Sequence, residues 1–295
     1  DRFVWSSERN GFRNFYLYDR SGKLIRPLTE NRFDGSDPEV REDSGELYYR
    51  AADGVNPYFL QLHRVGLDGK GDRRLTDPKF HHDVRVSPDG RYAVDRAQTP
   101  VDPPTTSLLD LKTGKSLGVI VAGDLAKFTD AKLRKAVPFE FVAADGKTPL
   151  YGLVWQPTTF DPAKKYPVVL DLYGGPESGG LPPTFARPRP ETELGFVVVT
   201  VAPRGTMGRG KAFRDAVYGK LGGPEIDDAA AGIRAAGALF PWFDATRVGL
   251  HGTSYGGTFT LMSMLRYPDL YKAGAASSSV SDGPESAEIY TERYM

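Results

Sequence analysis

The sequence predicts two structural classes in succession: an all-β half made of propeller-like blades, then an α/β half with a mostly parallel sheet. Residues 1 to about 130 contain short aromatic and apolar runs between turn sequences and no long amphipathic helix. From residue 138 on, strand-like apolar runs alternate with helix-like runs. A Gly-x-Ser-x-Gly pattern centred on Ser254 lies where one such strand passes into a helix.

Composition narrows the classes of function. The 295 residues are enough for two domains, each with its own core. Lys plus Arg and Asp plus Glu both number 38, so the formal net charge is zero and a nucleic-acid partner is disfavoured. Because there is no cysteine, disulfides, thiol catalysis and cysteine-bound zinc are excluded. No apolar run reaches the roughly 18 residues of a membrane span.

The first half reads as a β meander with a repeat. A weak repeat is visible, in which residues 16–18, a glycine turn and Pro-Leu-Thr at 27–29 recur as residues 60–62, another glycine turn and Arg-Leu-Thr at 74–76. Leu28 and Leu75 are 47 residues apart, which is close to the period of a four-stranded propeller blade. Residues 87–92 and 107–115 continue the meander with further turn sequences. Two or three blades cannot close a propeller, so we expect late blades of a larger one.

A short segment over residues 125–136, either helical or irregular, is predicted to separate the halves, which gives domain limits of 1–135 and 136–295. The second half predicts strands at 139–142 and 150–155, and mainly apolar strands at 166–172, 196–201 and 247–251. Helices are expected at 226–239 and 258–266. This order predicts right-handed crossovers and chemistry at the carboxyl ends of the strands.

Ser254 is predicted to be a nucleophile at a strand-to-helix turn. Gly252, Gly256 and Gly257 surround it, as such a turn requires, because the backbone is strained and side chains there would collide with the helix and the next strand. The turn lifts the serine oxygen out of the sheet and points the following N–H at the same place. The sequence therefore predicts an α/β-hydrolase domain that is partial, ending after the nucleophile helix region.

A second motif, Tyr173 followed by Gly174, Gly175 and Pro176, lies at the carboxyl end of an earlier strand. Acyl transfer needs donors aimed at the developing oxyanion, and hydrolases of this fold draw one from a Gly-rich loop at this place. Taken alone the stretch is typical of a simple turn beside a packed tyrosine. Together with the serine motif it predicts an oxyanion loop.

These motifs resemble the prolyl oligopeptidase family of serine peptidases, and most closely its dipeptidyl peptidase IV branch. Residues 171–176 are similar to the oxyanion loop of the family, 252–257 to its serine motif and 290–295 to a stretch typical of the branch. Residues 5–11 and 28–29 look like late propeller blades. The resemblance implies a β-propeller joined to an α/β-hydrolase domain that cleaves short peptides, often after a proline at the second position.

The resemblance also implies roles for single residues. Ser254 would be the nucleophile, and the Tyr173 hydroxyl and the Tyr255 N–H would form the oxyanion hole. The Tyr255 ring, Tyr290 and Val280 would line the pocket for the residue before the scissile bond, where a flat aromatic slot suits proline. On sequence alone, Tyr290 fits a core tyrosine equally well.

Three departures from the family pattern limit this assignment. Gly283 and Ser286 stand where the branch has aromatic residues, which leaves strict proline preference open. Pro203 replaces an acid before Arg204, which we predict to be structural and paired with a carboxylate. The acidic pair that binds a substrate's free amino terminus lies, in the family, upstream of the region that matches Asp1.

The partners that would activate Ser254 are not evident. In this fold the catalytic triad follows the chain order Ser, then Asp or Glu, then His. No histidine follows Ser254, so we expect the acid and the base to lie beyond Met295. We therefore expect the chain to be an internal part of a longer protein. His251, three residues before Ser254, cannot easily turn to serve as the base. The remaining histidines belong to the β half as surface or blade residues: His63, His81 and His82.

The sequence thus predicts a serine exopeptidase that releases Xaa-Pro or Xaa-Ala-like dipeptides from the N-termini of short peptide substrates through an acyl-enzyme on Ser254. An acylaminoacyl-peptidase, an oligopeptidase, an esterase of the same fold and a catalytically inactive binding scaffold stay open. No metal or organic cofactor is predicted, because the histidines are scattered and the Gly-Gly-Pro loop has no phosphate-binding lysine. The resemblance allows a homodimer and suggests a bacterial periplasmic location.

Overall fold

The computed structural model describes residues 2–281 and 288–294. Its contacts divide the chain into two compact units. Unit 1 is the chain up to Asp124 with Pro182–Phe185 and Gly208–Ala212, and unit 2 holds the remainder. This division places residues 125–135 with the second unit, and the predicted domain limits of 1–135 and 136–295 stay a prediction.

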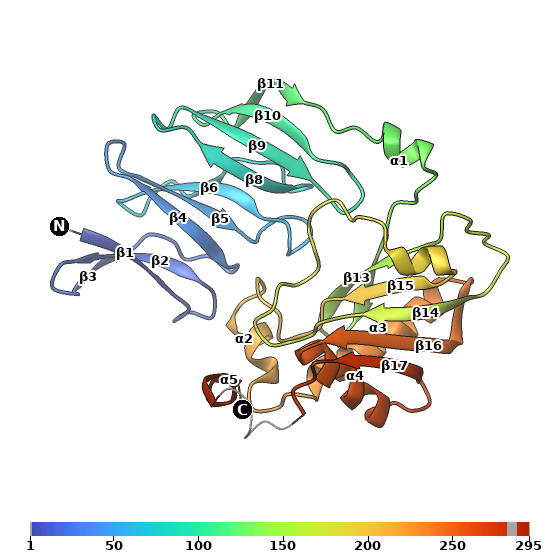
Figure 1. Ribbon diagram of the computed structural model, residues 1–295. Helices are drawn as coiled ribbons and strands as arrows, with labels where there is room; N and C mark the ends of the chain where they lie inside the picture. Colours follow the sequence, from blue (N-terminus) through green and yellow to red (C-terminus); the bar gives the residue numbers. More distant parts are fainter. Residues whose placement is uncertain (1, 282–287, 295) are drawn as a thin grey trace. The chain divides into compact units, whose positions relative to one another are not determined.

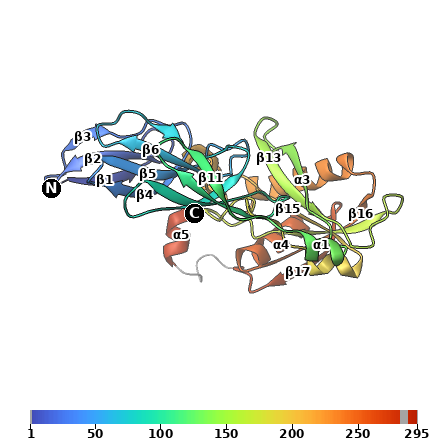
Figure 2. The same ribbon diagram turned by 90° about the horizontal axis from the view of Figure 1, so that it is seen from above.

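Unit 1 contains three antiparallel meander sheets (Figure 1; seen from above in Figure 2). In each sheet, strands that follow one another in the sequence are also neighbours in space. The first sheet has the strands β1 (Arg2–Ser7), β2 (Asn14–Asp19) and β3 (Leu24–Pro27). The second has β4 (Gly35–Arg41), β5 (Glu46–Ala51), β6 (Gln61–Gly66) and β7 (Arg73–Arg74). The third has β8 (His81–Val86), β9 (Tyr92–Gln98), β10 (Thr105–Asp110) and β11 (Lys115–Val121).

The 47-residue repeat has the same hydrogen bonds in both of its copies. The N–H of Leu28 donates to the carbonyl of Phe15, and the N–H of Leu75 donates to the carbonyl of Leu62, at 2.8 Å in both cases. The threonine after each leucine accepts a bond of 3.0 Å from the N–H of the same partner, Phe15 or Leu62. Both leucines are buried. The repeat therefore marks equivalent blade positions, as expected.

Two blade histidines are buried in strands and bound by carboxylates. In β6, His63 lies between Asp53 and Asp72, each 3.2 Å from a ring nitrogen. Burial by itself lowers the pKa of His63, but the hydrogen bonds to both aspartates outweigh burial and raise it. In β8, His82 is 2.9 Å from Asp95. The sequence left these histidines as either surface or blade residues. The structure places His63 and His82 in blade strands with buried side chains.

Unit 2 is built on one six-stranded sheet in the order β12-β13-β15-β14-β16-β17. β12 and β13 pair antiparallel with each other, and β13 pairs antiparallel with β15. The other pairs are parallel, so the carboxyl ends of β14, β15, β16 and β17 lie at one edge. The strands are β12 (Val137–Val142), β13 (Pro149–Trp155), β14 (Tyr166–Asp171), β15 (Val197–Val201), β16 (Phe243–Thr253) and β17 (Tyr271–Ser277).

The strand β17 was not expected from the sequence. It reads Tyr-Lys-Ala-Gly-Ala-Ala-Ser, and these small residues have weak strand propensity. The strand forms because it pairs with β16 from Val248 to Thr253, which provides a ready template of backbone donors and acceptors. Tertiary pairing therefore decides its conformation.

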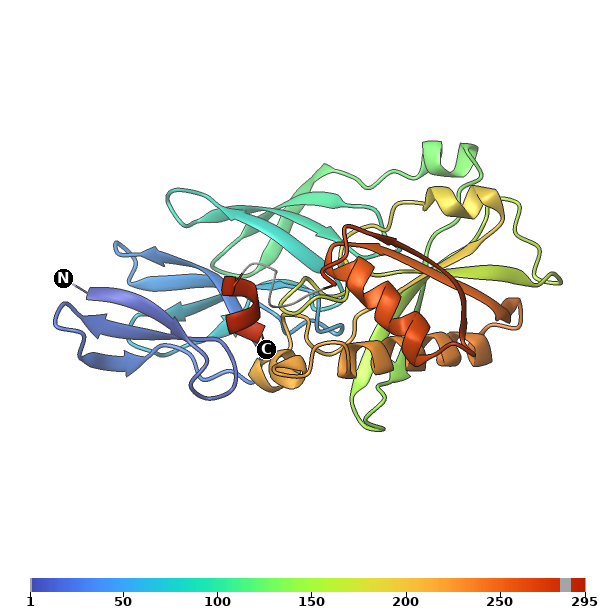
Figure 3. The ribbon, with the colours of Figure 1, turned by 60° about the horizontal axis from the view of Figure 1, so that its bottom comes forward.

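Helices cover the sheet and frame the serine. The long helices α3 (Pro224–Leu239) and α4 (Tyr255–Arg266) contact each other and lie on the same face (Figure 3). Ile226 and Ile233 of α3 and Phe259 of α4 are buried against the apolar strands in one core. The shorter elements are α1 (Ala126–Asp130), η1 (Pro190–Leu194), α2 (Lys211–Arg214), η2 (Asp215–Val217) and α5 (Glu288–Tyr294).

Candidate active site

Ser254 lies between β16 and α4 in a strained backbone conformation. Its φ is 60° and its ψ is −123°, which is unfavourable for any residue with a side chain. Its N–H donates to the carbonyl of Ser277 in β17 at 2.9 Å, and its own carbonyl accepts the N–H of Gly257 at 2.9 Å. The side chain is exposed. The strain is therefore held by hydrogen bonds on both sides, and the hydroxyl is presented to solvent.

The glycines around Ser254 are required by close backbone approach. A Cβ on Gly252 would lie 2.5 Å from the carbonyl atoms of Gly256. On Gly256 it would lie 2.9 Å from the carbonyl oxygen of Leu172, and on Gly257 it would lie 2.6 Å from that of Ser277. Backbone atoms cannot rotate away as side chains do, so the turn forms only with glycine at these positions.

Tyr173 starts the loop that follows β14 and lies beside the turn. Its ring centroid is 6.2 Å from that of Tyr255, with the planes tilted by 57°. A Cβ on Gly174, whose φ is 68°, would lie 2.7 Å from the ring of Phe259 in α4. The loop thus packs directly on the first turns of α4, which brings Tyr173 to the residue after Ser254. The Tyr173 side chain is 46% exposed.

Tyr290, in α5, lies close to these two tyrosines. It packs against the core cluster that contains Tyr255, and its ring centroid is 4.7 Å from that of Tyr294. Its hydroxyl is buried and, within the described residues, has no hydrogen-bond partner. Burial raises the pKa of Tyr290, and the nearby hydroxyl of Tyr173 raises it further. Tyr290 therefore packs on the core that contains Tyr255, and Tyr255 is the ring neighbour of Tyr173.

Val280 follows β17, and its carbonyl accepts the Thr258 hydroxyl of α4 at 2.8 Å. This bond holds the segment after β17 against the first turn of the nucleophile helix. Gly283 and Ser286, which were expected to widen the pocket, lie outside the described residues. The roles predicted for the five site residues stay predictions: Ser254, Tyr173, Tyr255, Tyr290 and Val280.

Glu177 was missed by sequence reasoning. It lies just beyond the Gly-Gly-Pro of the oxyanion loop, with a φ of 53°, and its N–H donates to the carbonyl of Gly205 at 2.8 Å. Its carboxylate accepts bonds from Arg293 at 2.5 Å and from the Tyr294 hydroxyl at 3.0 Å. Glu177 thus joins the loop that carries Tyr173 to the helix that carries Tyr290.

Glu225 was also missed, because a glutamate after a proline in a first helical turn is typical of an ordinary helix start. Its side chain is 1% exposed, and its Oε1 accepts the Tyr255 hydroxyl at 2.6 Å. Burial raises the pKa of Glu225, while the hydrogen bonds from Tyr255 and from the N–H of Gly222 act in the opposite direction. A carboxyl group therefore lies directly behind the Tyr255 ring.

Arg204 pairs with carboxylates, as predicted. Its Nε and Nη2 donate to the two oxygens of Asp228 at 2.8 Å each, and its Nη1 donates to Asp145 at 3.0 Å. The backbone N–H groups of Arg204 and Ala144 also donate to Asp228, both at 3.0 Å. This network ties the turn after β12 and the end of β15 to α3, which is a structural role.

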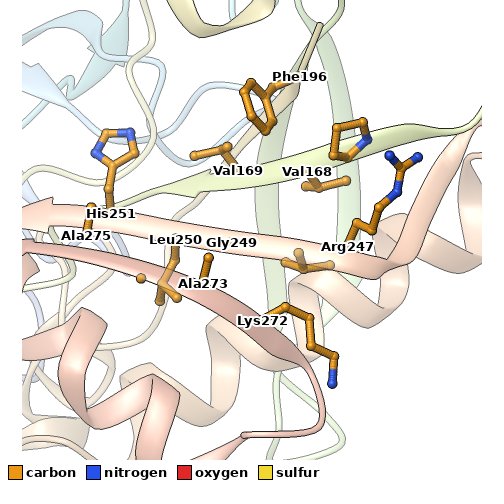
Figure 4. Close-up of a pocket in the computed structure, with 13 residues that line it drawn as sticks. Val168, Val169, Phe196, Arg247, Gly249, Leu250, His251, Lys272, Ala273 and Ala275 are labelled. Carbon is orange, nitrogen blue, oxygen red and sulfur yellow. The ribbon is translucent and has the colours of Figure 1, made fainter. Parts of the chain in front are cut away.

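His251 faces acidic neighbours. Its Nε2 lies 3.7 Å from Glu191 and 3.9 Å from Asp171. The imidazole borders a hollow of about 420 Å³ along β14, β16 and β17, where Val169, Phe196 and Ala273 also lie (Figure 4). We assign His251 no role in catalysis.

Within residues 2–281 and 288–294, no group of three His, Asp or Glu side chains is arranged to hold a metal ion. In the same residues, no helix is both long enough and apolar enough to cross a membrane.

A strained serine between a strand and a helix, at the carboxyl edge of a mainly parallel sheet, defines an α/β-hydrolase domain, here with propeller-like blades before it. The chain belongs to the prolyl oligopeptidase family. Residues 184–295 match the model of the prolyl oligopeptidase family, and residues 1–104 match that of the dipeptidyl peptidase IV N-terminal region. Both the predicted family and the predicted fold class, partial blades followed by an α/β-hydrolase domain, are confirmed.

Similar proteins include human dipeptidyl peptidase 8, which is 31% identical over 99% of this chain and 37% of its own length. Dipeptidyl-aminopeptidase B of Aspergillus niger is 31% identical over 95% of this chain and 32% of its own length. The crystal structure of Porphyromonas gingivalis dipeptidyl peptidase 4 matches the whole chain with a TM-score of 0.85 and 29% identity, over 42% of that structure. The chain thus spans less than half the length of these relatives.

Proposed function

We propose that the whole protein is a serine dipeptidyl peptidase that releases dipeptides from the N-termini of short peptides through an acyl-enzyme on Ser254. The observation that carries this proposal is the conformation of Ser254, an exposed side chain on a strained turn at the head of α4. Strain of this kind persists only where the surrounding structure enforces it, and it is concentrated at reactive sites. The names of the relatives, dipeptidyl peptidases and dipeptidyl-aminopeptidases, support the reaction.

The chemistry needs a nucleophile and an oxyanion site. The Ser254 oxygen attacks the carbonyl carbon of the scissile peptide bond, and its proton passes to a general base. The negative charge that forms on the carbonyl oxygen is stabilised by the Tyr255 N–H and the Tyr173 hydroxyl. The C–N bond then breaks, the amine leaves with a proton, and water hydrolyses the ester to release the dipeptide and restore the serine hydroxyl.

The pocket for the residue before the scissile bond would be lined by Tyr255, Tyr290 and Val280. The proximity of the tyrosines supports an aromatic slot, which suits the flat ring of proline or the small side chain of alanine. The general base and its orienting acid would come from the part of the whole protein outside these residues. A homodimer and a periplasmic location are further proposals that rest on the family alone.

The test uses the whole protein and the variant Ser254→Ala. A fluorophosphonate probe should label the wild-type protein and not the variant, and chromogenic Xaa-Pro and Xaa-Ala dipeptides should be cleaved only by the wild type. Equal labelling of both proteins would remove Ser254 as the nucleophile.

Substrates with a blocked amino terminus separate the alternatives within the fold. Preference for acylated peptides would indicate an acylaminoacyl-peptidase, cleavage within longer peptides an oligopeptidase, and turnover of simple esters alone an esterase. Absence of both labelling and cleavage would indicate an inactive binding scaffold.

A further inference from the structure

Glu225 is a buried carboxyl group with a specific partner in the candidate site. Its Oε1 accepts two hydrogen bonds, from the Tyr255 hydroxyl at 2.6 Å and from the N–H of Gly222 at 2.5 Å. Its Oε2 is buried and has no partner in the described part of the chain. Burying a carboxylate is costly unless it is paired, so a group at this position needs a compensating role.

The hydrogen bond to Tyr255 is of the strong kind. An O–H donor 2.6 Å from a carboxylate lies in the range of charge-assisted bonds, which are about twice as strong as neutral ones. Glu225 also lies in the first turn of α3, where the helix dipole favours negative charge. Burial raises the pKa of the Tyr255 phenol, with the Glu225 carboxylate as the next cause, so the phenol stays a proton donor.

This bond determines the position of the Tyr255 ring. The ring is anchored at one end by the backbone beside Ser254 and at the other by the phenol oxygen, so it cannot swing to another χ1 rotamer without breaking the bond. One neighbour of the ring is Tyr173, whose ring centroid is 6.2 Å away. Tyr290 packs against the core cluster to which Tyr255 belongs. The carboxyl group therefore anchors Tyr255, the central ring of the candidate slot.

We propose that Glu225 is a positioning residue that holds the Tyr255 ring, through its phenol, as a fixed wall of the substrate pocket. This inference rests on the proposed function, because it assigns Tyr255 to the pocket. Glu225 itself does not touch the substrate. Its bond to Gly222 stabilises the start of α3, so its loss would lower the stability of the fold. Its bond to Tyr255 sets the shape of the slot, so its loss would weaken binding of groups that fill the pocket.

The test compares two covalent probes of Ser254 in the whole protein. An alkyl fluorophosphonate needs only the nucleophile and the oxyanion site, whereas a proline-based diphenyl phosphonate must also fill the pocket. The variants are Glu225→Gln, which keeps the size of the side chain and an acceptor oxygen for Gly222 and Tyr255 but removes the charge, Tyr255→Phe, which removes the bond, and the double variant. Glu140→Gln, an exposed carboxylate of β12, is the matched control.

We expect Tyr255→Phe to lower the labelling rate of the prolyl probe about tenfold relative to the alkyl probe, as loss of a hydrogen bond to a charged group predicts. Glu225→Gln should lower it less, because it removes only the charge that strengthens the bond. With Xaa-Pro substrates the loss should appear as a higher KM and a nearly unchanged kcat. The double variant should be no worse than Tyr255→Phe alone, because without the phenol there is no bond for the charge of Glu225 to strengthen. The control should match the wild type.

Three results would overturn the inference. Effects that multiply in the double variant would show that Glu225 does not act through the Tyr255 phenol. An equal fall with both probes, together with a lower unfolding midpoint, would show a purely structural role. A wild-type protein that reacts with neither probe would remove the proposed function and the pocket role with it, and this failure is visible before any variant is made.

Discussion

Removal of the Arg204 guanidinium should strongly destabilise unit 2. Asp228 is completely buried and receives four hydrogen bonds, two of them from this guanidinium. In Arg204→Met the carboxylate keeps only the two backbone donors, the N–H groups of Arg204 and Ala144. A buried charge that loses its partner costs about 3–5 kcal/mol, and the remaining backbone bonds favour the lower end, about 3 kcal/mol.

The chain offers a matched control in Arg247→Met. Arg247 also pairs with an aspartate, Asp244, at 2.8 Å, but 54% of its side chain is exposed. Exposed pairs contribute about 0–1 kcal/mol because water solvates both partners after the pair is lost. The difference between the two variants therefore isolates the effect of burial.

Urea unfolding followed by tryptophan fluorescence measures the difference in unit 2. Of the three tryptophans, Trp155 and Trp242 are buried in unit 2, whereas Trp5 is exposed in unit 1, so the signal reports mainly on unit 2. With a slope of about 2.5–3 kcal/mol/M, Arg204→Met should lower the midpoint by about 1 M and the control by less than about 0.4 M. Equal shifts in the two variants would refute the reasoning.

Three further predictions concern the site and the blades. Gly252→Ala should abolish fluorophosphonate labelling, because the added Cβ would lie 2.5 Å from the backbone of Gly256. Labelling at the wild-type rate would show that the turn tolerates a side chain at this position. In unit 1, Nδ1 of His81 accepts the N–H of Leu60 at 3.1 Å, and burial lowers the pKa of His81 to about 4. Because the unfolded pKa is about 6.5, the neutral form stabilises the fold fully above about pH 6.5, and that stability is lost as the pH falls toward 4. Urea midpoints measured by circular dichroism between pH 7 and pH 4 should show this fall, and His81→Gln should flatten it; an unchanged slope would contradict the assignment. The Tyr290 hydroxyl has no hydrogen-bond partner among the described residues, so Tyr290→Phe should keep kcat/KM for Xaa-Pro substrates within about twofold of the wild type. Tyr290→Ala removes the ring and should lower kcat/KM about tenfold or more. A larger loss in Tyr290→Phe than in Tyr290→Ala would show that the hydroxyl matters.

Sequence alone located the features that are encoded within a few adjacent residues. The glycines around Ser254 and the Gly-Gly-Pro after Tyr173 are local requirements of backbone geometry, and the structure shows the close approaches that impose them. The repeat around Leu28 and Leu75 was readable for the same reason, because each copy carries its own turn and its own buried leucine. Patterns of this kind can be recognised in a sequence without knowledge of the fold.

Only the tertiary structure decided which distant residues support the site. Glu225 and Tyr255 are 30 positions apart, and Glu177 and Arg293 are 116 apart, so no local pattern links either pair. The strand β17 likewise exists because β16 offers a partner, not because its small residues favour extension. A tight turn depends on a few adjacent residues, so the sequence alone predicts it. A buried carboxylate gains its partner only when separate elements pack together and exclude water from both groups, so the tertiary structure decides that pair.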